Sequence, residues 1–163
     1  MGTPLFRVNM GQTIFHVMIK TKVFDAITRP SETEKKQVVN FLYENLEQYG
    51  DAKADILKCI NYAVKETMSF GGFVLLSYEG NTITGAVIVN QTGMGGYIPE
   101  NILVYIATHK DFRGMGIGKK LMEETLNFAK GDIALHVEAN NPAKKLYEKY
   151  GFTNPYLEMR LKR

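Results

Sequence analysis

Three closely spaced glycines beside three cationic residues form the stretch of this sequence best suited to bind a ligand. Residues 108–121 read Thr-His-Lys-Asp-Phe-Arg-Gly-Met-Gly-Ile-Gly-Lys-Lys-Leu. Glycines adopt positive φ and let a ligand approach bare backbone N–H groups. A helix that begins near Ile117 adds unpaired N–H donors and the positive end of its dipole. With the charges of Arg113, Lys119 and Lys120, the stretch predicts a site for an anion, and in particular for a phosphate chain.

The glycine spacing narrows the choice of phosphate ligand. A dinucleotide fingerprint needs a third glycine where this chain has Lys119. A Walker A loop needs glycine at Arg113 and Ser or Thr at Lys120. The pattern that remains is R-x-x-G-x-G, formed by Arg113, Gly116 and Gly118. By itself it also fits a tight strand-to-helix turn that binds nothing.

A second motif follows about twenty residues later. Residues 133–138 are typical of a strand, and residues 140–152 read Asn-Asn-Pro-Ala-Lys-Lys-Leu-Tyr-Glu-Lys-Tyr-Gly-Phe. Either Asn140 or Asn141 can cap a helix that carries Pro142 in its first turn and ends at Gly151.

Together the two motifs resemble the GCN5-related N-acetyltransferase (GNAT) superfamily. In that family R/Q-x-x-G-x-G/A binds the pyrophosphate of acetyl-coenzyme A, and N-x-x-A-x-x-L-Y…G-F forms the facing helix. The resemblance covers the C-terminal half closely and the N-terminal half only by the order of its elements. The matching residues are Arg113, Gly116, Gly118, Asn140, Ala143, Leu146, Tyr147, Gly151 and Phe152.

The resemblance implies acetyl-CoA as the cosubstrate and a set of residues that contact it. This chain departs from the family by Thr108 in place of the common Val and by Lys110 in place of Pro. The segment between Val137 and Tyr147 is one residue shorter than usual, so either asparagine can take the family role. The residues expected to contact acetyl-CoA are Ile106, Ala107, Thr108, Arg113, Gly114, Met115, Gly116, Ile117, Gly118, Lys119, Asn140, Asn141, Ala143 and Tyr147.

Acetyl transfer to an amine needs a neutral amine, donors for the oxyanion and a proton for the leaving thiolate. The resemblance makes Tyr147 the proton donor, although a packing role also fits, and places the oxyanion donor on the backbone near residues 106–108. For the base we expect His136, because histidine titrates near neutrality. Glu100 is a further candidate. Both also have structural interpretations: a strand histidine bonded to a backbone carbonyl, and a carboxylate in a solvated loop.

Length and composition fit one globular domain. The chain has 163 residues, of which 45% are hydrophobic and 23% charged, and a net charge of +3. This charge is too small to indicate nucleic acid or a membrane as a partner. The single cysteine, Cys59, rules out an internal disulfide and favours a reducing compartment. We therefore expect a cytoplasmic protein with no metal site, since no His/Cys cluster has ligand spacing.

Periodicity and caps predict the order β-α-α-β-β-β-α-β-α-β, an α/β mixed sheet flanked by helices. This is also the element order of the GNAT acyl-CoA N-acyltransferase fold, in which strands 102–108 and 133–138 would splay apart around coenzyme A. Strand 102–108 is almost continuously apolar, which predicts burial on both faces. We expect a loose leader at 1–12 and a single domain at 13–163. The predicted elements are strands at 14–22, 73–78, 82–91, 102–108, 133–138 and 156–161, and helices at 31–49, 51–68, 117–130 and from 143.

The sequence thus predicts an N-acetyltransferase that moves an acetyl group from acetyl-CoA to a primary amine by direct attack in a ternary complex. The alternatives are a coenzyme A-binding sensor without turnover and an α/β interaction domain without a ligand. The acceptor, a small-molecule or peptide amine, is not specified, because it would be set by the two N-terminal helices and the tip at 93–96. The oligomeric state is equally open.

Overall fold

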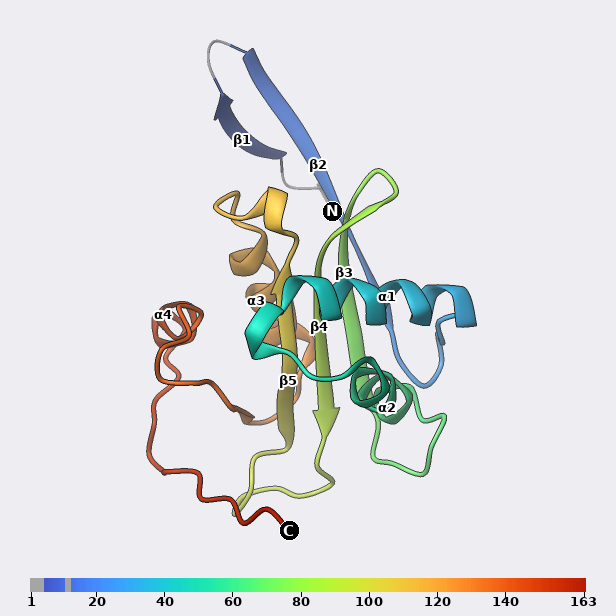
Figure 1. Ribbon diagram of the computed structural model, residues 1–163, viewed down its shortest axis with the longest axis vertical. Helices are drawn as coiled ribbons and strands as arrows, with labels where there is room; N and C mark the ends of the chain where they lie inside the picture. Colours follow the sequence, from blue (N-terminus) through green and yellow to red (C-terminus); the bar gives the residue numbers. More distant parts are fainter. Residues whose placement is uncertain (1–4, 11–12) are drawn as a thin grey trace.

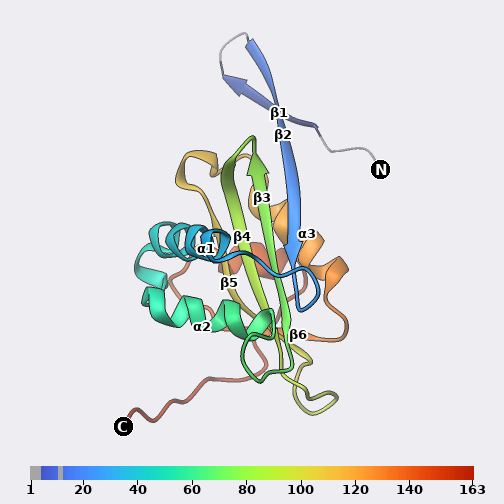
Figure 2. The ribbon, with the colours of Figure 1, turned by 90° about the vertical axis from the view of Figure 1, so that its right-hand side faces the viewer.

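The computed structural model describes residues 5–10 and 13–163, with side chains from Met18 onward. Its sheet has six strands in sequential order, β1 to β6. Figures 1 and 2 show α1 and α2 on one face of the sheet and α3 on the other. The elements are β1 (Leu5–Met10), β2 (Thr13–Phe24), α1 (Glu32–Asn45), η1 (Glu47–Tyr49), α2 (Lys53–Ala63), β3 (Gly72–Glu79), β4 (Thr82–Gln91), β5 (Asn101–Thr108), η2 (Lys110–Phe112), α3 (Ile117–Phe128), β6 (Ile133–Leu135) and α4 (Lys144–Lys149).

Strands β1 to β5 pair antiparallel with their neighbours, and β5 pairs parallel with β6. The first half of β2 pairs with β1 and the second half with β3. Leu5–Met10 therefore form a strand in place of the loose leader expected there. The reason is the length of β2: it runs past the end of β3, and β1 pairs with the edge left over. The rest of the expected leader, residues 1–4 and 11–12, lies outside the described residues.

Helix α1 begins at the capping box expected from the sequence. The Ser31 hydroxyl accepts a hydrogen bond from the Glu34 N–H, and the Glu34 carboxylate accepts one from the Ser31 N–H. A hydrogen bond from Lys22, followed by that from Ser31, lowers the pKa of Glu34. The helix ends four residues earlier than expected, because Glu47 takes a φ of +54° and starts a short 3₁₀ turn.

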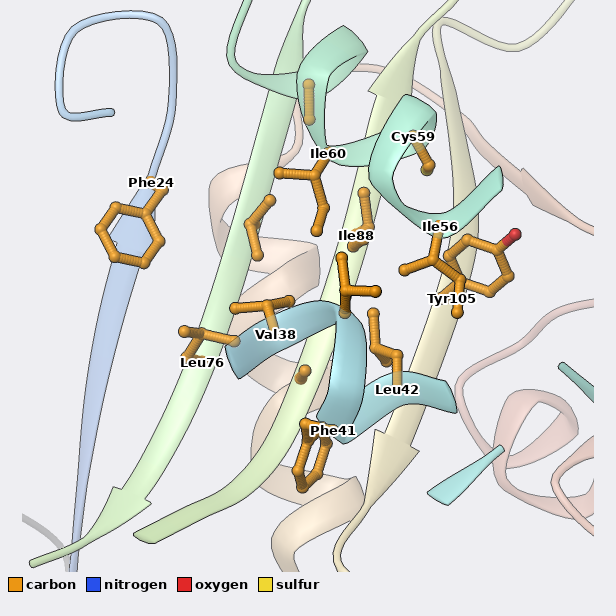
Figure 3. Packing of buried hydrophobic residues seen from close by; sticks show 14 of the residues in the cluster. Phe24, Val38, Phe41, Leu42, Ile56, Cys59, Ile60, Leu76, Ile88 and Tyr105 are labelled. Atoms are coloured by element: carbon orange, nitrogen blue, oxygen red, sulfur yellow. The ribbon is translucent and has the colours of Figure 1, made fainter. Parts of the chain in front are cut away.

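Two hydrophobic cores lie on the two faces of the sheet. The core beneath α1 and α2 is drawn in Figure 3, where Val38 and Leu42 from α1 meet Ile56 and Ile60 from α2 over Ile88. All five are essentially fully buried. The other core joins α3 to the opposite face through Leu121 and Met122. The helical spacing of the apolar residues thus positions α1 and α2 as predicted.

Gly85 in β4 allows α3 to pack closely on the sheet. A Cβ at this position would lie 2.6 Å from Leu121 Cδ1 and 2.9 Å from Ile117 Cγ2, inside van der Waals contact. The side chains of Leu121 and Ile117 are both almost fully buried. Gly85 therefore fixes how near the N-terminus of α3 can come to β4 and β5.

Three expectations for the C-terminal half are corrected. Strand β6 ends at Leu135 instead of Glu138, and residues 156–161 form no strand. Strand β5 alternates buried with half-buried residues instead of being buried on both faces. The half-burial in β5 agrees with its pairing, since only Asn101–Leu103 have a neighbour on the β6 side.

Candidate active site

Strands β5 and β6 separate after three residue pairs. Asn101 to Leu103 pair with Ile133 to Leu135, and no strand of the described residues pairs with Val104–Thr108 on that side. The backbone of this part of β5 is therefore free to bond a ligand that enters between the strands. This is the splay expected from the sequence.

A β-bulge marks the point of separation. On β4, Ile88 faces Tyr105 and Val89 faces Leu103, which leaves Val104 as the extra residue. As a result Val104 and Tyr105 both pack in the core under α1 and α2, whereas Leu103 and Ile106 pack on the α3 side. A bulge bends its strand and increases its twist, so it turns the end of β5 away from β6.

The glycine turn at the end of β5 leaves the N-terminus of α3 open. Gly114 and Gly116 have φ of +78° and +81°, values that favour glycine. Gly116 is the N-cap, so no side chain caps the helix, and the first turn carries no acidic residue. The first helical bond runs from Lys120 N–H to Gly116 C=O, which leaves the N–H groups of Ile117, Gly118 and Lys119 free of helical acceptors. Free N–H groups at a helix N-terminus are suited to bind an anion, which is the role that the glycine spacing predicts for this turn.

The end of α1 anchors the turn. Arg113 donates hydrogen bonds to the Glu47 carboxylate and to the Asn45 carbonyl, both at 3.1 Å. The Lys110 N–H donates to the Asn45 side-chain oxygen at 3.0 Å. Sequence reasoning missed these contacts, because α1 and the turn lie more than sixty residues apart and no local pattern links them.

Tyr147 is buried on α4. Its side chain is 7% exposed, its ring packs against Phe152 at 6.0 Å between centroids, and burial raises the pKa of its phenol to about 12. Within the described side chains its hydroxyl makes no hydrogen bond. Asn141 accepts a hydrogen bond from the Ala143 N–H and so caps the turn into α4, whereas Asn140 is exposed. Asn141 thus uses its side-chain oxygen within the turn, whereas the side chain of Asn140 makes no hydrogen bond among the described residues.

His136 follows the end of β6 and is exposed. Ile133, Leu135 and Val137 pack toward the α3 core. Because side chains alternate along an extended chain, His136 points to the opposite face, the one that carries α1 and α2. It follows directly on Leu135, the last residue of β6 that pairs with β5.

Glu100 lies at the other end of β5 from the glycine turn, and the eight residues of this strand span roughly 26 Å. Its carboxylate accepts a hydrogen bond from the Asp132 N–H at 2.7 Å, and this bond is the main cause that lowers its pKa. A Cβ on Gly131 would lie 2.6 Å from the carboxyl carbon of Glu100, so the two residues are in close contact. These contacts support a role for Glu100 in joining the loop before β5 to the loop before β6.

A tyrosine–aspartate pair borders the α1 and α2 side of β5. The Tyr105 hydroxyl donates a 2.6 Å hydrogen bond to Asp51, and burial, together with that carboxylate, raises the pKa of Tyr105. Figure 3 shows Tyr105 beside Ile56 with its hydroxyl directed away from the core. Sequence reasoning also missed this pair, since 54 residues separate the partners.

Two absences concern the part of the chain that the structure describes. Among residues 18–163, whose side chains are described, no group of three or more His, Cys, Asp or Glu side chains is arranged to hold a metal ion. No helix in that part of the chain has the length and apolar character needed to cross a bilayer.

Comparison with known proteins identifies the family. Residues 70–154, just over half of the chain, match the model of the acetyltransferase (GNAT) domain. The chain therefore belongs to the GNAT family of acetyltransferases, and its mixed sheet with flanking helices is the fold of that family.

Solved structures show the same fold over nearly the whole chain. A GNAT family acetyltransferase from Streptococcus pneumoniae is 18% identical, with a TM-score of 0.65, over 90% of this chain and 98% of that one. A protein described as a transcriptional regulator from Bacillus halodurans is also 18% identical, with a TM-score of 0.62, over 88% and 100%. A ribosomal-protein-alanine N-acetyltransferase from Brucella melitensis biovar Abortus is 12% identical, with a TM-score of 0.61, over 89% and 99%.

Proposed function

We propose that this acetyltransferase moves an acetyl group from acetyl-CoA to a primary amine, by direct attack within a ternary complex. The observation that carries the proposal is the unpaired end of β5 leading to the uncapped N-terminus of α3. Such an opening offers backbone donors along an extended ligand and ends at an anion site. Residues 13–163 form the catalytic domain in this proposal.

The residues present fit acetyl-CoA, which supplies an acetyl group activated as a thioester. A Cβ on Gly114 would meet no atom within 4 Å, so this side of the turn is open to a pyrophosphate. A hollow of about 400 Å³ between α3 and α4 is proposed to take the nucleotide end. It is lined by Lys119, Glu123, Leu146, Lys149 and Tyr150. The residues proposed to hold the cosubstrate are Ile106, Ala107, Thr108, Arg113, Gly114, Met115, Gly116, Ile117, Gly118, Lys119, Asn140, Asn141, Ala143 and Tyr147.

Tyr147 is the proposed proton donor to the departing thiolate. Because burial raises the pKa of its phenol to about 12, the hydroxyl keeps its proton throughout the neutral range. It belongs to the same buried cluster as Ile117, the first residue of α3. This supports a fixed donor beside the anion site.

His136 is the proposed base that accepts the proton of the incoming amine, either directly or through water. It is exposed and points to the α1 and α2 face. Glu100 stays the second candidate, but its carboxylate is already bonded to the Asp132 N–H and its lowered pKa makes it a weaker base.

The acceptor amine is proposed to approach from the face of α1 and α2. Asp51 and Tyr105 lie at this face, and a carboxylate there favours a cationic amine before it loses its proton. A small-molecule amine and a peptide amine both fit. The free thiol of Cys59 is buried, which agrees with the cytoplasm, the compartment we propose.

Calorimetric titration with acetyl-CoA, followed by a thiol-release assay with a panel of amines, tests the proposal. We expect micromolar binding, loss of binding in Gly116→Val, and thiol release with at least one amine. The matched control is Gly80→Val, in the turn between β3 and β4. Gly80 also has a positive φ but is not among the residues proposed to hold the cosubstrate. Binding without release for any amine would favour the sensor, and no binding by the wild-type protein would overturn both.

A further inference from the structure

The backbone N–H groups between β5 and the glycine turn find their acceptors in different places. Those of Asp111 and Phe112 donate to the ring and to the carbonyl of His109, at 3.2 and 2.9 Å. The Lys110 N–H donates instead to the side-chain oxygen of Asn45, the last residue of α1, at 3.0 Å. A backbone donor away from water needs a partner, and this one depends on a side chain that lies 65 residues earlier in the sequence.

Two elements of the fold hold this segment in place. On the side of β4, the His109 N–H donates to the Thr84 carbonyl at 2.8 Å. On the side of α1, the His109 ring packs against Phe41 at 6.3 Å between centroids, and Asn45 adds its hydrogen bond. Figure 1 shows α1 crossing the sheet and ending in front of β5. The end of α1 therefore supports the chain that leads into the glycine turn.

The side chain of Asn45 is oriented at both of its polar atoms. Its amide nitrogen donates to the Phe41 carbonyl one turn earlier in the helix, at 2.9 Å, while its oxygen accepts from Lys110. Asparagine is a poorer helix former than alanine, because its side chain competes for backbone groups. Helix stability therefore does not explain an asparagine at this position, whereas the bond to Lys110 does.

Lys110 lies directly before the residues proposed to hold the pyrophosphate. Arg113 follows three residues later, and α3 begins at Ile117 with N–H groups free of helical acceptors. These groups can bind an anion together only in the arrangement that the turn gives them. A turn that moves in the free protein must be ordered when a ligand binds, and this ordering lowers the affinity. Asn45 can thus affect binding without touching the ligand.

We propose that Asn45 is a positioning residue for the acetyl-CoA site. By accepting the Lys110 N–H, its side-chain oxygen holds the glycine turn in the conformation that binds the pyrophosphate. The inference rests on the proposed function, because it needs acetyl-CoA at this turn. It adds a residue of α1, outside both sequence motifs, to those that determine the affinity for the cosubstrate.

A proline at position 110 would remove the need for Asn45. Lys110 is the first residue of η2 and follows His109, whose ψ of 133° is the extended conformation that proline requires of the residue before it. Proline is favoured at the first position of a helix, where its φ of about −65° fits and its missing N–H leaves no helical bond unmade. Lys110→Pro therefore deletes the donor that Asn45 serves and keeps the turn rigid.

Calorimetric titration with acetyl-CoA compares the wild-type protein with Asn45→Ala, Lys110→Pro and the double variant. Asn45→Ala should raise the dissociation constant about 10-fold, because the turn is then ordered only on binding. Lys110→Pro should stay near the wild-type value, and adding Asn45→Ala to it should cause no further loss. The matched control is Asn40→Ala on the same helix, whose side-chain oxygen accepts from Lys53 of α2 at 2.8 Å. Circular dichroism melts show that each variant is folded.

The outcomes separate this inference from the proposed function. If the wild-type protein binds acetyl-CoA and Asn45→Ala binds it equally well, or loses the same amount in both backgrounds, Asn45 does not act through Lys110 and the inference is wrong. If the wild-type protein does not bind, the proposed function itself fails and the inference falls with it.

Two further measurements distinguish positioning from a general loss of structure. In steady-state kinetics, Asn45→Ala should raise KM for acetyl-CoA while kcat and KM for the amine stay unchanged. In amide exchange followed by NMR without ligand, the Lys110 N–H should exchange faster in Asn45→Ala, whereas the His109 N–H, bonded to Thr84, should keep its protection. An unchanged exchange rate at Lys110 would contradict the inference even where binding of acetyl-CoA is confirmed.

Discussion

Arg113 bonds to the carboxylate of Glu47 at 3.1 Å and so ties the glycine turn to the end of α1. The two side chains are 47% and 50% exposed. An exposed pair of this kind contributes about 0–1 kcal/mol. Arg113 can therefore exchange this partner for a phosphate at little cost, while its bond to the Asn45 carbonyl holds the turn in place.

This exchange predicts different effects for the two partners. Arg113→Ala should weaken acetyl-CoA binding about 10-fold, which corresponds to about 1.4 kcal/mol, because it removes a charge from the anion site. Glu47→Ala should leave the dissociation constant within about 2-fold. Calorimetry measures both. Equal losses in the two variants would mean that Arg113 only anchors the turn.

Tyr147→Phe should lower kcat about 10²–10⁴-fold with little change in acetyl-CoA affinity, since it removes the proposed proton donor and keeps the buried ring. Tyr62→Phe is the matched control. Its hydroxyl donates to the Gln91 carbonyl, away from the residues proposed to hold the cosubstrate, and should not matter for turnover. Steady-state kinetics measure kcat for the two variants. An unchanged kcat in Tyr147→Phe would mean that Tyr147 is not the proton donor.

The raised pKa of Tyr147 has a consequence for stability at high pH. Below about pH 10 the phenol is protonated in both the folded and the unfolded chain, so it gives no pH dependence. Between 10 and 12 the unfolded chain releases this proton and the folded chain keeps it. The free energy of unfolding should therefore fall as the pH rises through this window.

Comparison of urea denaturation of the wild-type protein with that of Tyr147→Phe between pH 9 and 11 isolates this contribution. The variant should lose less stability over the interval. When the folded wild-type protein is titrated, its tyrosinate absorbance should include one group that ionises near pH 12. This group should be missing from folded Tyr147→Phe. A group that ionises near 10 in its place would contradict the burial of the hydroxyl.

His136→Ala should flatten the acidic limb of the pH–rate profile and reduce kcat/KM about 10²-fold or more, if it takes the proton of the amine. Glu100→Gln should leave the shape of the profile unchanged and lower the melting temperature, because the hydrogen bond to the Asp132 N–H loses its charge. The reverse pattern would assign the base to Glu100.

Gly118→Ala should raise stability and lower affinity together. In the protein its Cβ would meet Leu146 at 3.5 Å, an ordinary contact, and alanine in a helix gains about 0.5–1 kcal/mol over glycine. The same methyl group would lie in the first turn of α3, where the cosubstrate approaches. Gly85→Ala is the contrast: its Cβ would clash with Leu121 and should cost about 1–3 kcal/mol. Denaturation of the two variants without acetyl-CoA measures their stability, and the added stability in its presence reports their affinity for it.

The features that the sequence predicted correctly are local ones. The residues that form the capping box at Ser31 lie within a few positions of one another, and so do those of the glycine turn before Ile117. Backbone propensity and local hydrogen bonding act over that range. The hairpin of β3 and β4 was predicted for the same reason.

The features that the sequence could not predict depend on distant partners. The bulge at Val104 exists only relative to β4, and an apolar run looks the same with or without it. The bonds of Glu47 to Arg113 and of Asp51 to Tyr105 join segments that no periodicity relates. The strand expected at 156–161 has the right pattern, but a strand also needs a paired neighbour, and these residues pair with no strand of the described sheet. The roles of Tyr147, His136 and Glu100 are still predictions.

The two hydrophobic cores differ in how completely their side chains are buried. The core under α1 and α2 consists mainly of fully buried side chains, whereas the α3 core is bordered by half-buried ones from the C-terminal part, such as Leu135, Val137 and Phe152. Regions of this kind open at a lower free energy than the rest of a protein. A ligand that binds only the closed form adds about 2.7 kcal/mol at a concentration 100 times its Kd. Amide exchange in residues 133–152 should thus slow sharply when acetyl-CoA is added, while exchange in β3 and β4 changes little.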